Sequence, residues 1–267
     1  MRGQRVLGLL CLLFASLVLA DPAVDTVLQS PARIALIIDD LGNQEAAGEQ
    51  ALALPGAVTY SFLPQTPFAR RQASMAHSLQ KEVMLHLPME SDQGNPLGAG
   101  ALTLDMSQAK VLETLQRDLD SVPFVSGINN HMGSLLTRDP TAMRWLMTGL
   151  RERELFFIDS RTTDGTVAER VARANLIATS RRHVFLDNVQ DAASVKARLM
   201  ELIETARRQG EAIGIAHPYP ETLAVLAEEL PKLKAEGIEL VPASALTYPR
   251  SELWHASSSP LPKGVKN

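Results

Sequence analysis

Short runs of apolar residues recur along the chain, separated by longer amphipathic stretches. The first run, Arg33 to Ile38, is almost continuously apolar, as expected of a parallel strand that is covered on both faces. Similar runs follow at 58–63, 82–87, 125–128, 155–158, 184–186, 212–216 and 238–241. We interpret these runs as the strands of one sheet.

Helical periodicity predicts helices in the intervals between the strands. Ser107 is suited to cap one helix, and Asp139-Pro140 to begin another, because proline fits the first helical turn. The clearest predicted helices cover 107–122, 139–150, 195–210 and 221–234, the last bent at Pro231. Alternating strands and helices predict an α/β fold with one barrel-like or doubly wound parallel sheet.

The N-terminus has the three-part pattern of a secretory signal peptide. Basic residues lie within Met1–Arg5, an apolar run covers Val6–Ala20, and Val18 and Ala20 are small enough for signal peptidase. The alternative is a membrane anchor, but this run is shorter than the roughly 20 residues that span a bilayer. We therefore expect cleavage after Ala20 and export to the periplasm, with secretion as the alternative.

The predicted organisation is a signal peptide at 1–20, a linker at 21–32, one domain at 33–249 and a disordered tail at 250–267. The tail prediction rests on its serine, proline and lysine content. No transmembrane segment is expected after signal cleavage, and Cys11, the only cysteine, leaves with the signal peptide. The mature protein can therefore form neither a disulfide nor a cysteine nucleophile.

Composition and charge exclude some functional classes. The 267 residues include 26 Lys and Arg against 30 Asp and Glu, a formal net charge of −4. The chain therefore lacks the basic surface that nucleic-acid binding requires, and we expect no nucleic-acid partner.

Polar residues that are suited to catalysis follow several of the predicted strands. They are Asp39-Asp40, His86, Asn129-Asn130-His131, Asp159-Ser160 and His217. In α/β folds, ligands and catalytic groups gather at the carboxyl ends of the strands. Imidazoles and paired carboxylates that converge on one rim are suited to a divalent metal such as Zn²⁺.

Each of these residues also has a purely structural interpretation. Asp39 and Asp40 could cap a following helix, and His86 could be a hydrogen-bonded core histidine. Asp159 and Arg161 could form an internal ion pair. We assign structural positions to the remaining histidines, which are His77, His183 and His255.

Five blocks together resemble the divergent polysaccharide deacetylase family, which is related to the carbohydrate esterase family 4 (NodB-like) deacetylases. They are IALIIDDLG, VMLHLPME, INNHMGS, FFIDSRT and IAHPYPET, and the resemblance covers roughly Arg33 to Tyr248. The resemblance implies a distorted (β/α) barrel of about seven parallel strands. It also implies a hydrolase that depends on a divalent metal, expected to be Zn²⁺, and that deacetylates a carbohydrate.

The resemblance implies a role for each candidate residue. Asp39 would be the base, and Asp40 and His86 would be metal ligands. His217 would be the acid, and we ourselves expect Asp159 or Arg161 to hold it or tune its pKa. Relatives usually carry a second histidine a few residues beyond the first, and Glu90 has that place here. We therefore expect His131 as the third ligand, with Glu90 in reserve.

Three functional hypotheses remain open at this point. The first is a deacetylase that removes N-acetyl or O-acetyl groups from an envelope or extracellular glycan. The second is an inactive exported protein that binds a carbohydrate or a protein partner and keeps the metal site. The third is an inverting glycosidase in which Asp39 and Glu90 form a metal-free acid pair.

Overall fold

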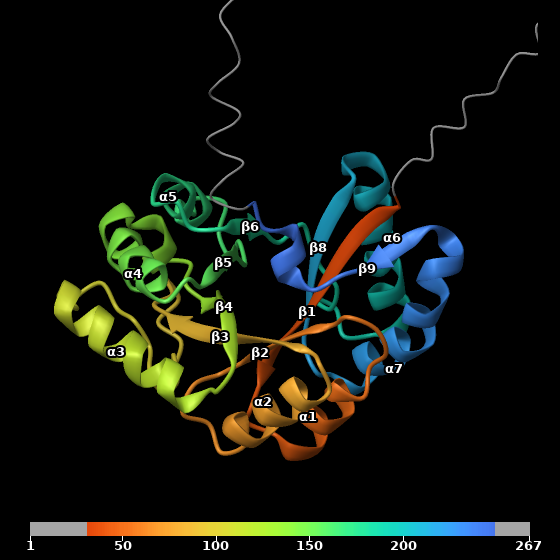
Figure 1. Cartoon of the computed structure of the whole chain (residues 1–267), viewed down its shortest axis with the longest axis horizontal. Helices are drawn as coiled ribbons and strands as arrows, with labels where there is room; N and C mark the ends of the chain where they lie inside the picture. Colours follow the sequence, from red (N-terminus) through yellow and green to blue (C-terminus); the bar gives the residue numbers. More distant parts are fainter. Residues whose placement is uncertain (1–30, 249–267) are drawn as a thin grey trace, which may run out of the picture. The chain divides into compact units, whose positions relative to one another are not determined.

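The computed structural model describes residues 31–248 (Figure 1). The predicted signal peptide, the predicted tail and all but the last two residues of the predicted linker lie outside this range. None of the helices within residues 31–248 is long and apolar enough to cross a membrane.

One parallel sheet of nine strands forms the centre of the domain. The strand order is β6-β5-β4-β3-β2-β1-β8-β7, and β9 pairs with the first half of β1. The strands are β1 (Ala32–Leu41), β2 (Thr59–Phe62), β3 (Glu82–Met89), β4 (Val125–Met132), β5 (Phe156–Asp159), β6 (Thr179–Arg181), β7 (Val184–Phe185), β8 (Glu211–Ala216) and β9 (Ile238–Leu240).

A kinked segment joins the two ends of this sheet. Strands β6 and β7 are separated by only Arg182 and His183, yet β6 pairs with β5 and β7 pairs with β8. The Arg182 amide donates to Asp159 of the β5 edge, and the next amide, of His183, donates to Ile213 of β8. The short strands β6 and β7 together fill one strand position between β5 and β8. Counted in this way, the strand order gives a distorted barrel with seven strand positions, which confirms the predicted fold. The polar sequence of β6, Thr-Ser-Arg, gave no apolar run by which to predict it.

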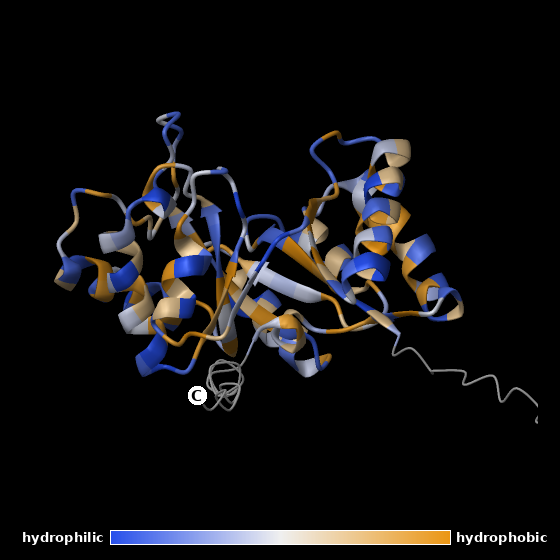
Figure 2. Ribbon diagram, turned by 90° about the horizontal axis from the view of Figure 1, so that it is seen from above, coloured by the Kyte–Doolittle hydropathy of each residue, from blue (hydrophilic) through white to orange (hydrophobic). Residues whose placement is uncertain are grey.

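Helices surround the outside of the strands (Figure 1), and their surfaces alternate between hydrophobic and hydrophilic positions (Figure 2). The α-helices are α1 (Glu45–Leu52), α2 (Ala69–Ser78), α3 (Gln108–Ser121), α4 (Pro140–Glu152), α5 (Ala168–Ala174), α6 (Ala192–Gln209) and α7 (Pro220–Glu229). Short 3₁₀ helices are η1 (Leu136–Arg138), η2 (Leu230–Glu236) and η3 (Ala243–Leu246).

The predicted helix boundaries are close to those in the structure. The Ser107 hydroxyl caps α3 by accepting from the Lys110 amide, and the Asp139 carboxylate caps α4. The helix predicted to bend at Pro231 changes there from α7 to the 3₁₀ helix η2. Proline lacks the amide proton that a continuing α-helix would need.

The strands bury apolar side chains on both faces, and alternate residues enter different cores. In β1, Ile34 and Ile38 pack in the core between sheet and helices, whereas Ala35 and Ile37 pack in a smaller core inside the barrel. Because side chains alternate along a strand, this parity determines which residues can reach the mouth of the barrel.

Asp118 of α3 anchors a loop at the mouth of the barrel. Its side chain is fully buried, and its Oδ1 accepts from Gln65 Nε2 at 2.7 Å. The other oxygen has no hydrogen-bond partner among the described residues. Burial raises the pKa of Asp118 to about 7, against hydrogen bonding from Gln65 and the charge of Arg117, which lower it.

We predict that Asp118 makes the protein less stable as the pH rises from about 4 to 7. The folded state holds a proton on Asp118 in this window and the unfolded state does not. The free energy of unfolding of Asp118→Asn, relative to that of the wild type, should therefore increase by about 2 kcal/mol from pH 5 to pH 8. Chemical denaturation at both pH values measures this, and the exposed Asp120→Asn on the same helix is the control. The same difference in unfolding free energy between variant and wild type at pH 5 and at pH 8 would contradict the prediction.

Candidate metal centre

A pocket of about 750 Å³ opens at the carboxyl ends of the strands. Its walls come from the loops after β1, β2 and β8 and from residues 96–99. Asp40, His131 and His217 line it together. The position agrees with the rule that ligands bind at the carboxyl ends of parallel strands.

Strand parity brings the polar residues of several strands to the inside of the barrel. His86 follows Met84 of the inner core by two residues, and His217 follows Ile215 in the same way. Asn129 lies directly beside His86 in the β3–β4 register, and His131 is two residues further on, on the same side. His86 and Asn129 are buried, and His131 is partly exposed in the pocket.

A backbone irregularity places both aspartates of the adjacent pair at the site. Alternation alone would direct Asp39 inward and Asp40 toward the helices. The β1–β2 register shifts between Ile38 and Leu41, and Asp40 has a left-handed backbone with φ 59°. Such a bulge redirects a side chain, so the Asp40 carboxylate also reaches the mouth of the barrel.

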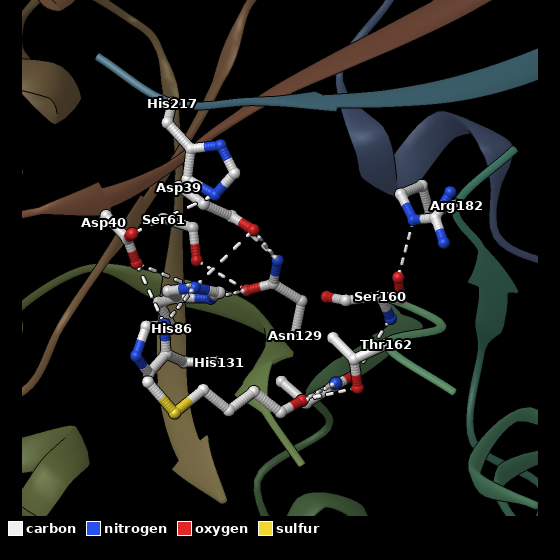
Figure 3. Close-up of polar contacts among 12 residues, drawn as sticks. Asp39, Asp40, Ser61, His86, Asn129, His131, Ser160, Thr162, Arg182 and His217 are labelled. Atoms are coloured by element: carbon white, nitrogen blue, oxygen red, sulfur yellow. Dashed lines mark hydrogen bonds and ion pairs between the residues drawn. The ribbon is translucent and has the colours of Figure 1, made fainter. Parts of the chain in front are cut away.

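Three possible ligand atoms lie close together at this point (Figure 3). Asp40 Oδ1 is 3.0 Å from His131 Nδ1 and 3.2 Å from His86 Nε2, and the two nitrogens are 3.1 Å apart. The neighbouring ligands of tetrahedral zinc, with bonds of about 2.0–2.1 Å, lie roughly 3.3 Å apart. Asp40 Oδ1 is also buried without a hydrogen-bond partner among the described residues. The donor set, its spacing and this unpaired oxygen all fit a divalent metal ion.

The carboxylates and imidazoles of the cluster stabilise each other's charged forms. Burial raises the pKa of Asp40, but the adjacent imidazoles of His131 and His86 outweigh it and hold this pKa well below its usual range. Burial lowers the pKa of His86, but the carboxylates of Asp39 and Asp40 more than offset this and raise it. A bound cation would take over the stabilisation that the histidines supply here.

Asp39 lies behind the ligand atoms and is almost fully buried. Its Oδ2 is 3.6 Å from His86 Nε2, and Asn129 Nδ2 lies 2.8 and 3.0 Å from its two oxygens. Burial raises the pKa of Asp39, although His86, His217 and the Asn129 hydrogen bond act in the opposite direction. A buried carboxylate with a raised pKa is suited to accept a proton near neutral pH.

His217 lies beside Asp40 and is held by Asp187. Its Nδ1 is 2.9 Å from Asp187 Oδ1, and its Nε2 faces the site, 3.9 Å from Asp40 Oδ2. Asp187 is buried and also accepts from the His217 amide and the Thr222 hydroxyl. Burial lowers the pKa of His217, but Asp187 more than compensates and raises it to about 9.

Two expected residues have other contacts in the structure. The sequence suggested Asp159 or Arg161 as the partner of His217, and the structure gives that position to Asp187. Asp159 follows Phe157 on the helix-facing side of β5, so strand parity directs it away from the barrel mouth. Its carboxylate accepts from the Arg161 and Glu169 amides and the Thr166 hydroxyl. A catalytic role for Asp159 stays a prediction from the sequence, without support from these contacts.

Glu90, the reserve ligand, also points elsewhere. Its carboxylate accepts from the Leu104 amide at 2.7 Å and so braces the loop after β3. It does not belong to the group of ligand atoms among the described residues. The Asp39–Glu90 acid pair of the glycosidase hypothesis therefore has no support in the contacts of Glu90.

Sequence reasoning missed Asp187 and Ser61. Asp187 follows the apolar run at 184–186, so the strand-end rule that selected His217 could have found it. Ser61 lies within β2, where nothing but strand parity indicates its inward position. Two histidines that we expected to be structural make structural contacts. His77 stacks on Phe124, and His183 accepts a hydrogen bond from the Ile213 amide. His255 lies outside the described residues.

Comparison with known proteins identifies the family. The model of the divergent polysaccharide deacetylase family matches residues 36–247, so this chain belongs to that family. It is 36% identical over 243 residues to the uncharacterized protein YibQ of Escherichia coli K12, covering 88% of this chain and 76% of YibQ.

Solved structures share the fold. The uncharacterized protein ATU2773 of Agrobacterium tumefaciens C58 has a TM-score of 0.78 and 26% identity, over 81% of this chain and 89% of that one. A mutant of BA3943, a CE4 family pseudoenzyme from Bacillus anthracis, has a TM-score of 0.50 and 15% identity, over 82% of this chain and 68% of that one. The second likeness shows the fold alone, and such a fold does not establish activity.

We predict that His86→Ala abolishes metal binding, because it removes a ligand nitrogen from the centre of the cluster. Glu90→Ala, an equally drastic change four residues along, should leave the metal content at the wild-type level. Elemental analysis of the purified proteins after zinc loading measures both. Unchanged stoichiometry in His86→Ala, or loss in Glu90→Ala, would contradict this assignment of the ligands.

Proposed function

We propose that this chain is an exported, zinc-dependent deacetylase that releases acetate from the amino sugars of an envelope or extracellular carbohydrate. The observation that carries the proposal is that Asp39 and His217 both border the three ligand atoms: Asp39 Oδ2 is 3.6 Å from His86 Nε2, and His217 Nε2 is 3.9 Å from Asp40 Oδ2. This arrangement supplies one proton acceptor and one proton donor beside a candidate metal site. Membership of the divergent polysaccharide deacetylase family supports the same reaction. Export and a periplasmic location rest on the signal-peptide pattern.

Asp40, His86 and His131 would hold the metal. Two imidazoles and a carboxylate form a ligand set typical of catalytic zinc, which has three protein ligands and one open position. When bound there, the ion would polarise the acetyl carbonyl and lower the pKa of a water molecule.

Asp39 and His217 would move the protons of the hydrolysis. Asp39 accepts a proton as the water oxygen bonds to the acetyl carbon. His217, protonated and held by Asp187, gives a proton from Nε2 to the amine nitrogen as the carbon–nitrogen bond breaks. The products are acetate and a free amino sugar, and both side chains return to their starting state by exchange with solvent.

The pocket lining favours an uncharged sugar. Apart from the site residues Asp40, His131 and His217, no acidic or basic side chain lines it among the described residues. Amide side chains such as Asn43, Gln44 and Gln65 suit sugar hydroxyl groups, and the ring of Tyr219 offers an apolar face. We therefore expect neutral N-acetylated oligosaccharides to bind better than glycans that carry carboxylates.

The alternative is an exported binding protein that keeps the metal site without turnover. This alternative is consistent with the family membership, because sharing a fold does not by itself establish catalytic activity. It predicts metal binding and glycan binding with no acetate release. The two hypotheses therefore differ in one measurable product.

We predict that Asp39→Asn lowers acetate release from N-acetylated oligosaccharides at least about 100-fold, because general-base catalysis typically contributes that much. Zinc content should remain at the wild-type level, since Asp39 is not among the three ligands. Acetate is measured enzymatically with both proteins at equal zinc occupancy. Undiminished release by Asp39→Asn would exclude Asp39 as the base. Zinc-loaded wild type without acetate release from any such substrate would favour the binding protein.

We also predict that Asp187→Asn lowers kcat roughly 100-fold, because His217 then loses the carboxylate that fixes its ring and stabilises its protonated form. Thr222→Val, which removes a single donor to Asp187, should have a much smaller effect. Steady-state kinetics with matched zinc content separates the two variants. An equal loss in both would indicate that the Asp187 contacts maintain only the local structure.

A further inference from the structure

One amide side chain connects the two functional halves of the site. Asn129 is fully buried and contacts both His86, a candidate metal ligand, and Asp39, the proposed base. Its Oδ1 is 2.9 Å from His86 Nδ1 and accepts from the Ser61 hydroxyl at 2.6 Å. Its Nδ2 lies within 3.0 Å of both oxygens of Asp39. All four side chains of this network are buried.

The neighbours of Asn129 determine which way its amide points. A carboxylate only accepts hydrogen bonds, so the NH₂ end of the amide must face Asp39. The carbonyl oxygen then faces His86 and Ser61. The opposite orientation would place this oxygen against the Asp39 carboxylate, a repulsive contact between two acceptors. The arrangement therefore has one consistent pattern of donors and acceptors.

This pattern determines the tautomer of His86. Because Asn129 Oδ1 can only accept, His86 Nδ1 must carry a proton and donate it. Nε2 is then the nitrogen that faces Asp40 and His131, and it offers its lone pair to a metal there once it gives up its own proton. Metal-binding histidines commonly hold their other ring nitrogen in this way, and the partner fixes both the tautomer and the ring orientation.

We propose that Asn129 is a positioning residue that keeps the Nδ1 proton of His86 in place, so that Nε2 is the nitrogen left for a metal, and that holds Asp39 in its working orientation. An amide performs both tasks without adding a charge, whereas a cationic side chain here would repel the incoming metal ion. The part concerning Asp39 rests on the proposed function. The part concerning His86 does not, because zinc binding can be measured without a substrate.

Two variants separate the two tasks. Asn129→Ala removes both ends of the amide, and we expect zinc affinity to fall about 10- to 100-fold, as is typical when the partner of a metal-bound histidine is lost. Asn129→Asp keeps an oxygen that accepts from His86 and Ser61 but loses the donor to Asp39. It should bind zinc at least as tightly as the wild type, while both variants lose at least tenfold in acetate release.

The measurements are zinc affinity by competition with a chromophoric chelator and the His86 tautomer by ¹⁵N NMR of the imidazole nitrogens. Asn175→Ala is the matched control, because the side-chain amide of Asn175 donates to the Val171 carbonyl within α5. It should leave zinc affinity unchanged. If Asn129→Ala does not fold, as judged by thermal unfolding, Asn129→Leu replaces it, since leucine keeps the bulk without either polar end.

Unchanged zinc affinity in Asn129→Ala or Asn129→Leu would overturn the proposal. An equal loss in Asn129→Asp and Asn129→Ala would also overturn it, because the acceptor oxygen would then be irrelevant. If zinc affinities follow the expectation but wild type releases no acetate, the deacetylase proposal fails while the positioning of His86 stands.

Discussion

The site depends on one local departure from regular strand geometry, the bulge at the end of β1. A regular strand would direct Asp39 into the barrel and Asp40 into the layer of helices. The left-handed backbone of Asp40 turns its carboxylate back to the mouth, where it meets His86 and His131. Non-glycine residues adopt this conformation at a free-energy cost, and such strain tends to occur at functional sites. Without it the three ligand atoms would not share one point.

The remainder of the site consists of polar groups that would be unfavourable to bury singly. Asp39, His86, Asn129 and Asp187 are all nearly or fully buried. Burying a polar or charged group is tolerable only when hydrogen bonds or opposite charges compensate it. Each carboxylate here has an amide or imidazole partner, and Asn129 serves two groups at once. Asp40 Oδ1 lies beside two imidazoles but makes no hydrogen bond among the described residues, and it is the atom that a cation would satisfy.

Much of this architecture could be predicted from the sequence because it follows from local patterns. The apolar runs identify most strands, and the residues directly after them, such as Asp39 and His217, lie at the site. The alternation of side chains along each strand would have predicted more of the site than the strand ends alone. It places Ser61, Asn129 and Asp187 inside the barrel and Asp159 outside it, which decides between Asp187 and Asp159 as the partner of His217. What local patterns do not contain is the bulge that redirects Asp40 and the loop contact that uses Glu90. Both depend on neighbouring strands and loops that are distant in sequence.

The central claim is that Asp40, His86 and His131 bind one divalent metal ion together. Anomalous diffraction at the zinc absorption edge, from crystals of the zinc-loaded protein, tests it most directly. The account predicts one strong peak at the mouth of the barrel, within bonding distance of Asp40 Oδ1, His86 Nε2 and His131 Nδ1. A peak bound by other side chains, or no peak at full zinc saturation, would contradict it.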